Sequence, residues 1–269
     1  MKRVGWVVCV VLALGAPAFA EEAKEVVQRH SAELGYELYY HNYEEPGVME
    51  EDGLFHGIVG AYEYHRGLYA RAEVRGAWGE VDYASPVSGT VNGIDDWLFE
   101  SRLLGGYDFK AGEPLFVTPF FGLGWRYLND DSAGKVTTTG ALGYERESNY
   151  VYSPLGLAVV HVPKPGWRLR ASSEFDLFWF GKQTSHLSQA VSGVGDLKND
   201  QDSGYGVRGN IGVEKKGKTI DWWLDGFLRY WDIDDSDLQP VTYLGTTIGL
   251  GYEPKNDTVE VGGAIGLRF

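Results

Sequence analysis

The sequence has 269 residues, a formal net charge of −14, 37 glycines, 14% aromatic residues and one cysteine. The length fits one domain of about 250 residues, and the acidic balance excludes broad recognition of nucleic acid, which needs cations against the phosphates. The lone Cys9 falls in a segment that we expect to be removed, so disulfides, thiolate metal sites and cysteine nucleophiles are excluded as well.

The N-terminal residues 1–20 have the pattern of a cleaved secretory signal peptide. Two basic residues precede an apolar run over residues 4–14, and the sequence Ala-Phe-Ala at 18–20 is a typical cleavage site. The run is too short to span a membrane as a helix. Cleavage would leave 22 basic and 38 acidic side chains, a net charge of 22 − 38 = −16. We expect residues 21–31 to form a short periplasmic lead and residues 32–269 to form the folded domain.

From residue 32 onward, apolar and charged residues alternate with period two, which is the pattern of strands with one apolar and one charged face. Residues 167–179 are an example. One parity holds Trp167, Leu169, Ala171, Phe175, Leu177 and Trp179, and the other holds Arg168, Arg170, Ser172, Glu174 and Asp176. Ten such segments fit the roughly 9–11 residues that a tilted membrane strand needs. They span residues 32–43, 53–65, 68–80, 97–109, 115–128, 150–162, 167–180, 204–214, 219–231 and 257–269.

The connections between these segments alternate in length. Four are short, and five are long: 44–52, 81–96, 129–149, 181–203 and 232–256. Short periplasmic turns and long external loops are typical of outer-membrane barrels, which bacteria build with an even number of strands. Residues 241–252 also alternate, but we assign them to the last external loop to keep the count even. The sequence thus predicts an all-β, antiparallel transmembrane barrel of ten strands, within a range of eight to twelve, in the cell outer membrane; a soluble all-β domain is the alternative.

The C-terminal segment alternates from Val259 to a terminal phenylalanine, Phe269. Such an ending looks like the signal recognised by the barrel-assembly machinery of the outer membrane, so we assign Phe269 that role. Aromatic residues gather near strand ends, as membrane-interface girdles do. The expected surroundings are therefore outer-membrane lipid and lipopolysaccharide.

Several stretches resemble a family of porin-like outer-membrane barrel proteins of Gram-negative bacteria. They are GYELYYHNYEEPG, PFFGLGWRYLND, EFDLFWFGKQTS, NDQDSGYGVRG, RYWDIDDSD and EPKNDTVEVGGAIGLRF. The resemblance covers almost the whole mature chain and implies the fold and the location, but no activity.

If the apolar side chains of each strand face the lipid, the charged side chains at the alternate positions face the barrel lumen. The positively charged residues at these positions are arginines. The planar guanidinium group of arginine can make two parallel hydrogen bonds to a carboxylate, so we expect a lumen filled with interlocked ion pairs. A proton or substrate path is the alternative. The candidates are Arg71, Glu73, Arg75, Glu100, Arg102, Arg168, Arg170, Glu174, Asp176, Arg208 and Arg229.

The expected external loops are acidic, and their carboxylates could hold divalent cations. Weak metal candidates are Asp232, Asp234, Asp235 and Asp237. This stretch lacks the glycine and distal glutamate of an EF-hand, so we expect the loop carboxylates to be solvated.

The sequence predicts a non-enzymatic barrel with no cofactor and a structural or surface-interaction role. A small-solute porin is the alternative. The third option is a surface protease of the omptin type, which also has ten strands and uses an Asp–His couple near the external rim. No Asp-x-His and no Gly-x-Ser-x-Gly occurs in the chain.

Overall fold

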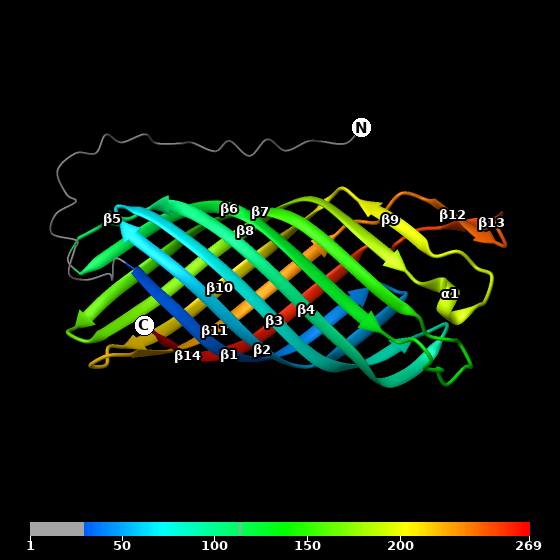
Figure 1. The fold of residues 1–269 in the computed structure, drawn as a ribbon, viewed down its shortest axis with the longest axis horizontal. Coiled ribbons are helices and arrows are strands. Elements are labelled where there is room, and N and C mark those ends of the chain that lie inside the picture. Colours follow the sequence, from blue (N-terminus) through cyan, green and yellow to red (C-terminus); the bar gives the residue numbers. More distant parts are fainter. Residues whose placement is uncertain (1–29, 113) are drawn as a thin grey trace.

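The computed structural model describes residues 30–112 and 114–269. Within these residues, ten long strands form a closed antiparallel barrel (Figure 1), which confirms the expected fold class. The expected signal peptide and residues 21–29 of the expected lead lie outside the described residues, and residues 30–31 already belong to the first strand. The barrel strands are β1 (His30–Glu45), β2 (Met49–Arg66), β3 (Leu68–Ser85), β4 (Gly89–Tyr107), β6 (Leu115–Asp131), β7 (Glu145–Lys164), β8 (Trp167–Ser185), β10 (Gly204–Lys215), β11 (Asp221–Ile233) and β14 (Asn256–Arg268).

Each barrel strand pairs with its neighbours in chain order, and β14 closes the ring on β1. The register places Glu33 opposite Arg268 and Glu44 opposite Asp257. Because closure leaves no free sheet edge, the backbone groups of the wall are paired among themselves, as a lipid environment requires.

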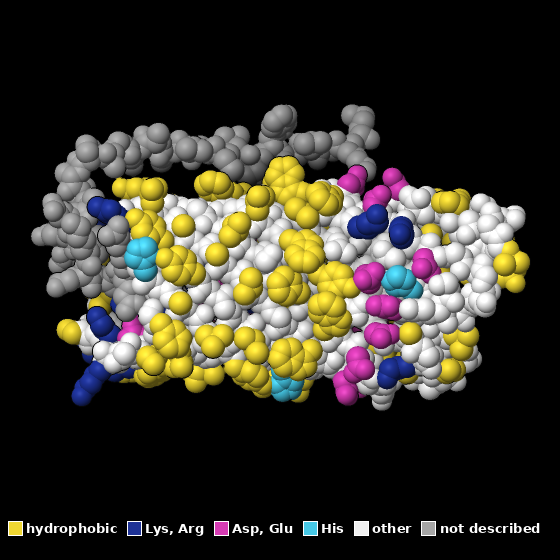
Figure 2. Space-filling model, in the orientation of Figure 1, with side chains coloured by type: hydrophobic (Ala, Val, Ile, Leu, Met, Phe, Trp, Pro, Cys, Tyr) yellow, Lys and Arg dark blue, Asp and Glu magenta, His cyan; other side chains and the backbone are white. Residues whose placement is uncertain are grey.

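The side chains of the wall are sorted in the opposite way to those of a soluble protein. In β1, Tyr36 and Leu38 are exposed on the outside, whereas Glu33 and Glu37 are buried inside. On the face that Figure 2 shows, the outer side chains form a broad hydrophobic belt that extends from near the left end to the middle of the barrel. Apolar area on the outside and charge on the inside suit a barrel that sits in lipid, and they are incompatible with the soluble alternative.

The two ends of the barrel differ. One end carries tight connections such as the turn at Gly67, whose φ of 76° is a conformation that glycine adopts without strain. This short-turn end also includes β5 (Phe109–Lys110), and both the start of β1 and the C-terminus lie there (Figure 1). By the layout of bacterial barrels, it faces the periplasm.

The opposite, long-loop end extends beyond the hydrophobic belt. It carries α1 (Leu187–Ala190), β9 (Leu197–Gln201), β12 (Gln239–Tyr243) and β13 (Thr246–Gly251). β12 and β13 pair with each other as a separate hairpin, so residues 241–252 add no strand to the barrel wall. In the described ranges, no helix has the length and apolarity needed to cross a membrane.

Two of the predicted long loops are wrong. β1 and β2 continue to a turn at residues 46–48, and β3 and β4 continue to a turn at residues 86–88. Seven strands, β1 to β4 and β6 to β8, are 16 to 20 residues long. This is well beyond the length that a membrane requires. The extra residues raise the wall above the membrane and enclose additional lumen.

Candidate functional site: the barrel lumen

The candidate site is the barrel lumen, which is lined by the charged, inward-facing side chains of the strands. Its side chains form three layers along the barrel, which we call the periplasmic, central and external layers. Aromatic side chains fill the space between them, including Trp223, whose ring packs against Gly35 and Gly266, where a β-carbon would collide with it.

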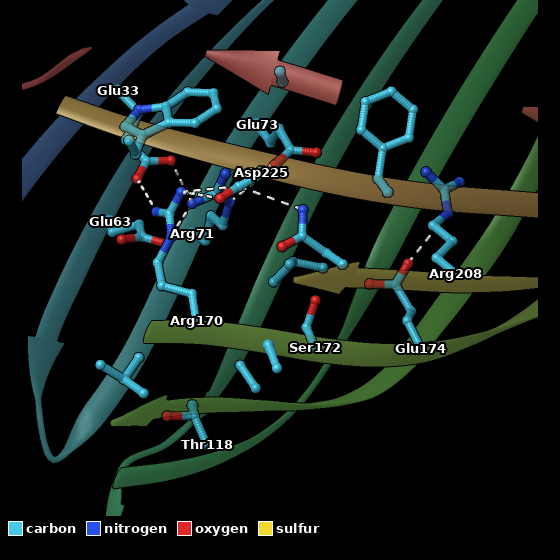
Figure 3. Close-up of a pocket in the computed structure, with 18 of the residues that line it drawn as sticks. Glu33, Glu63, Arg71, Glu73, Thr118, Arg170, Ser172, Glu174, Arg208 and Asp225 are labelled. Carbon is cyan, nitrogen blue, oxygen red and sulfur yellow. Dashed lines mark hydrogen bonds and ion pairs between the residues drawn. The ribbon is translucent and has the colours of Figure 1, made fainter. Parts of the chain in front are cut away.

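The periplasmic layer is built around Glu33 of β1. This carboxylate accepts contacts from Arg71 of β3 at 3.1 Å and from Arg170 of β8 at 2.8 Å, and it also pairs with Arg268 of β14. Arg170 in turn holds Asp225 at 2.9 Å, and Figure 3 shows these side chains converging from different strands. The periplasmic layer therefore links strands that are not neighbours in the barrel.

The central layer is built around Glu260 of β14, whose side chain is fully buried. It pairs with Arg126 at 2.8 Å, Arg75 at 2.8 Å and Arg229 at 3.0 Å. Because Arg126 lies on β6, five positions from β14 around the ring (β14–β1–β2–β3–β4–β6), this ion pair crosses the full width of the lumen.

A second group completes the central layer. Arg208 of β10 contacts Glu100 of β4 at 2.6 Å and Asp176 of β8 at 2.6 Å. Arg102 contacts Glu174 at 2.6 Å. Arg208 also lies over the ring of Tyr152, 5.3 Å from its centre, and this contact adds a cation–π attraction.

The external layer is built around Arg146 of β7. It contacts Glu253 at 2.6 Å and also pairs with Glu45 of β1, five positions away around the ring. Carboxylates outnumber arginines here, since Glu51, Asp96 and Asp130 lie close by. The register sets Asp96 directly opposite Asp130, an unfavourable pairing of like charges.

That arrangement makes the buried carboxylates of the external layer weaker acids than solvated ones. Burial raises the pKa of Asp130 to about 6, and burial together with Asp130 raises the pKa of Glu51 and of Asp96 well above their ordinary values. Asp130 Oδ1 has no hydrogen-bond partner.

The structure places the eleven lumen residues named from the sequence inside the barrel, and each has an ion-pair partner. They are Arg71, Glu73, Arg75, Glu100, Arg102, Arg168, Arg170, Glu174, Asp176, Arg208 and Arg229. The sequence reasoning missed the external layer. It treated Glu45, Glu51 and Asp96 as solvated loop residues, whereas they are buried. The sequence offers no signal for them, because both faces of the strands carry charged residues at these positions.

The weak metal candidates are not brought together. Lys255 Nζ contacts Asp232 at 2.5 Å and Asp234 at 3.9 Å, while Asp235 and Asp237 are exposed. An ammonium group thus takes the place that a cation would need there. An Asp–His contact does occur, although no Asp-x-His is present: His186 Nδ1 lies 3.2 Å from Asp196 Oδ2 at the long-loop end.

Free space inside the barrel is limited. A cavity of about 220 Å³ lies between the periplasmic and central layers, and Figure 3 shows Thr118 and Ser172 among its polar lining. A second cavity of about 380 Å³ lies under the long loops, among apolar side chains such as Met49, Ile94 and Leu197.

A family model and one solved structure agree with this architecture. A family model described as the autotransporter beta-domain matches residues 45–214. Among solved structures, the outer membrane protease OmpT from Escherichia coli is 10% identical over 90% of this chain and 96% of its own, with a TM-score of 0.61. A major outer membrane protein from Thermus thermophilus is 14% identical over 89% of this chain and 98% of its own, with a TM-score of 0.37. No curated protein matches the chain.

Proposed function

The chain belongs to the autotransporter beta-domain family, and from that premise we propose that this outer-membrane barrel is closed to solutes and serves a structural or surface-interaction role without enzymatic activity. The observation that carries the proposal is the Arg126–Glu260 ion pair, which joins opposite walls of the lumen at 2.8 Å. A solute that passed through the barrel would have to separate these two side chains.

Separating them is costly. Both side chains are fully buried, and removing one partner of a buried ion pair typically costs about 3–5 kcal/mol. Glu260 also holds Arg75 and Arg229, so the opening of one contact strains the others. Ten strands enclose little more than the eight-stranded barrels that side chains fill, and far less than the sixteen of open porins.

A narrow channel is the second candidate, and the cavity of about 220 Å³ favours it. Polar side chains line this space, so it could hold water or small ions up to the central layer. Permeation would still require a path past Glu260 and Arg126.

A protease of the omptin type has less support. Its catalytic couple would have to be Asp196 and His186, and His186 also contacts Glu147 at 3.0 Å on the outer wall. The likeness to OmpT, at 10% identity, concerns the fold.

Liposome swelling tests the closed barrel. Vesicles that contain the refolded protein should swell in a small sugar or amino acid no faster than protein-free vesicles. The Arg126→Ala, Arg75→Ala double variant, which removes two cations from Glu260, should swell faster if the ion pairs form the barrier. Swelling by the unmodified protein in proportion to its amount would overturn the proposal and favour the channel.

A further inference from the structure

We infer that Glu145, Glu147 and His186 form a binding site for a divalent transition-metal ion, with Zn²⁺ as the reference ion, on the outer wall of the barrel above the membrane. The inference is independent of whether the lumen conducts. It rests on a group of side chains that neither the ion-pair layers nor the proposed function uses.

The three side chains come together from separate segments. Glu145 and Glu147 lie on β7 with the parity opposite to the inward-facing Arg146, so they point out of the barrel. His186 follows the end of β8, and its backbone N–H donates to the carbonyl of Glu145 at 3.0 Å. One donor atom from each of the three side chains lies within 4.8 Å of the other two.

These distances suit a shared metal ion. Two donors that bind one zinc ion at about 2.0–2.1 Å in a tetrahedron lie about 3.4 Å apart. His186 Nε2 and Glu147 Oε2 are separated by 3.0 Å, and Glu145 is partly exposed, so its carboxylate can approach. An imidazole with two carboxylates favours Zn²⁺ and related ions over Mg²⁺ and Ca²⁺, which prefer oxygen ligands.

The surroundings orient each ligand in the way that metal sites do. A histidine that binds metal through one ring nitrogen usually donates its other N–H to a carboxylate. Here His186 Nδ1 lies 3.2 Å from Asp196 Oδ2, and Asp196 Oδ1 accepts a hydrogen bond from the backbone N–H of Ser188 at 3.1 Å. Asp196 therefore fixes the ring with Nε2 turned toward Glu147.

Both glutamates are held through one oxygen by a neutral donor. The hydroxyl of Tyr127 donates to Glu147 Oε1 at 2.5 Å, and the amide of Asn129 donates to Glu145 Oε1 at 2.7 Å. The second oxygen of Glu147 is the one that meets His186, and the second oxygen of Glu145 accepts a hydrogen bond from the side-chain amide of Gln189 at 3.1 Å. The amide oxygen of Gln189 also accepts a hydrogen bond from the backbone N–H of Glu145 at 2.8 Å, so a bound metal ion has to displace only the Gln189 N–H from the Glu145 carboxylate.

Charge favours a cation at this place. The register sets Asp131 opposite Glu145 on the same face, so Asp131, Glu145, Glu147 and Asp196 gather four carboxylates. Lys198, which acts on Glu147 from β9, supplies one nearby positive charge. In Figure 2, acidic side chains form a band at this level, beyond the end of the hydrophobic belt.

A zinc titration of the full, untagged chain, refolded in detergent at pH 7.5 and monitored by competition with a chromophoric chelator, tests the site. The unmodified protein should bind one Zn²⁺ per chain saturably. His186→Ala should weaken binding at least 100-fold. Asp196→Asn leaves the ligands in place, and it should weaken binding by about 10–100-fold because the ring loses its orientation.

His56→Ala is the matched control, since His56 also lies on the outer wall but contacts Tyr36 instead of carboxylates. It should bind zinc like the unmodified protein. Heat-modifiable gel mobility verifies that each variant is folded, and Glu147→Gln gives a second ligand variant should His186→Ala misfold. Absence of saturable binding by the unmodified protein, or equal affinity in the unmodified protein, His186→Ala and Glu147→Gln, would overturn the inference.

Discussion

Arg126 of β6 donates a hydrogen bond to Glu260 of β14 at 2.8 Å, although the two strands face each other across the barrel. Both side chains are fully buried, and Arg126 also lies over the ring of Trp231, 5.5 Å from its centre. The lumen is therefore braced at its centre by a charged pair and closed around it by aromatic rings.

Loss of this brace should destabilise the barrel. Arg126→Ala removes one of the arginines that compensate the buried Glu260, and we expect a loss of about 3–5 kcal/mol in the free energy of unfolding. Urea unfolding in lipid vesicles measures it. Arg66→Ala is the control, because Arg66 is exposed beside a short turn, and it should change stability by no more than about 0.5 kcal/mol. Equal unfolding midpoints for the two variants would contradict the role of the brace.

The external layer should make stability depend on pH. The folded-state pKa of Asp130, about 6, lies above the ordinary value of 3.8 because the carboxylate is buried. The folded protein therefore holds this proton more tightly than the unfolded chain, and its contribution to stability is present below about pH 4 and lost as the pH rises through 6.

The Asp130→Asn substitution should remove this loss of stability at high pH. The variant should unfold at higher urea than the unmodified protein at pH 8 and at about the same urea at pH 4. The exposed Asp202, between β9 and β10, supplies the control, since it lies outside the external layer and Asp202→Asn should leave the pH profile unchanged. An Asp130→Asn profile that still falls between about pH 4 and 6 would show that another group is responsible.

The orientation of the barrel predicts which ends reagents can reach. The expected mature chain contains no cysteine, so single cysteines can be introduced at Ser192, on the long-loop end, and at Lys216, on the short-turn end. An impermeant maleimide should label Ser192→Cys on intact cells, and it should label Lys216→Cys only after the outer membrane is permeabilised. Labelling of Lys216→Cys on intact cells would invert the orientation.

The C-terminal residue should matter for assembly more than for the finished fold. Phe269 is half-exposed, and its backbone pairs with Ala32 of β1 through hydrogen bonds of 2.9 and 3.2 Å, which any residue could make. Deletion of Phe269, or Phe269→Asp, should leave misassembled protein in the periplasm, whereas Phe269→Tyr should assemble. Wild-type amounts of heat-modifiable barrel in the Phe269→Asp variant would argue against an assembly signal.

The barrel wall could be predicted from the sequence because its two faces obey one simple rule. Alternation in β8 marks Arg168 and Arg170 as inward and Leu169 as outward, and the register follows from it. The same rule could not set the upper ends of the strands, because past the membrane the outer face becomes polar and the contrast disappears. Glu51 and Asp96 therefore looked like loop residues.

The group formed by Glu145, Glu147 and His186 could not be predicted from the sequence for a different reason. Glu147 and His186 are 39 residues apart, and they meet because the antiparallel register of β7 and β8 sets Arg146 opposite Ser185, which brings His186 beside Glu145. The spacing of these residues along the sequence does not indicate that contact. The pairing of specific charges, such as Arg146 with Glu253, likewise depends on the closed three-dimensional ring.

Planar-bilayer recording of the refolded, unmodified protein is the most direct test of the closed lumen. With the Arg126–Glu260 brace in place, insertion should give no steady conductance, while an open sixteen-stranded porin recorded under the same salt gives large, stable steps. Stable conductance steps from the unmodified protein would contradict the account.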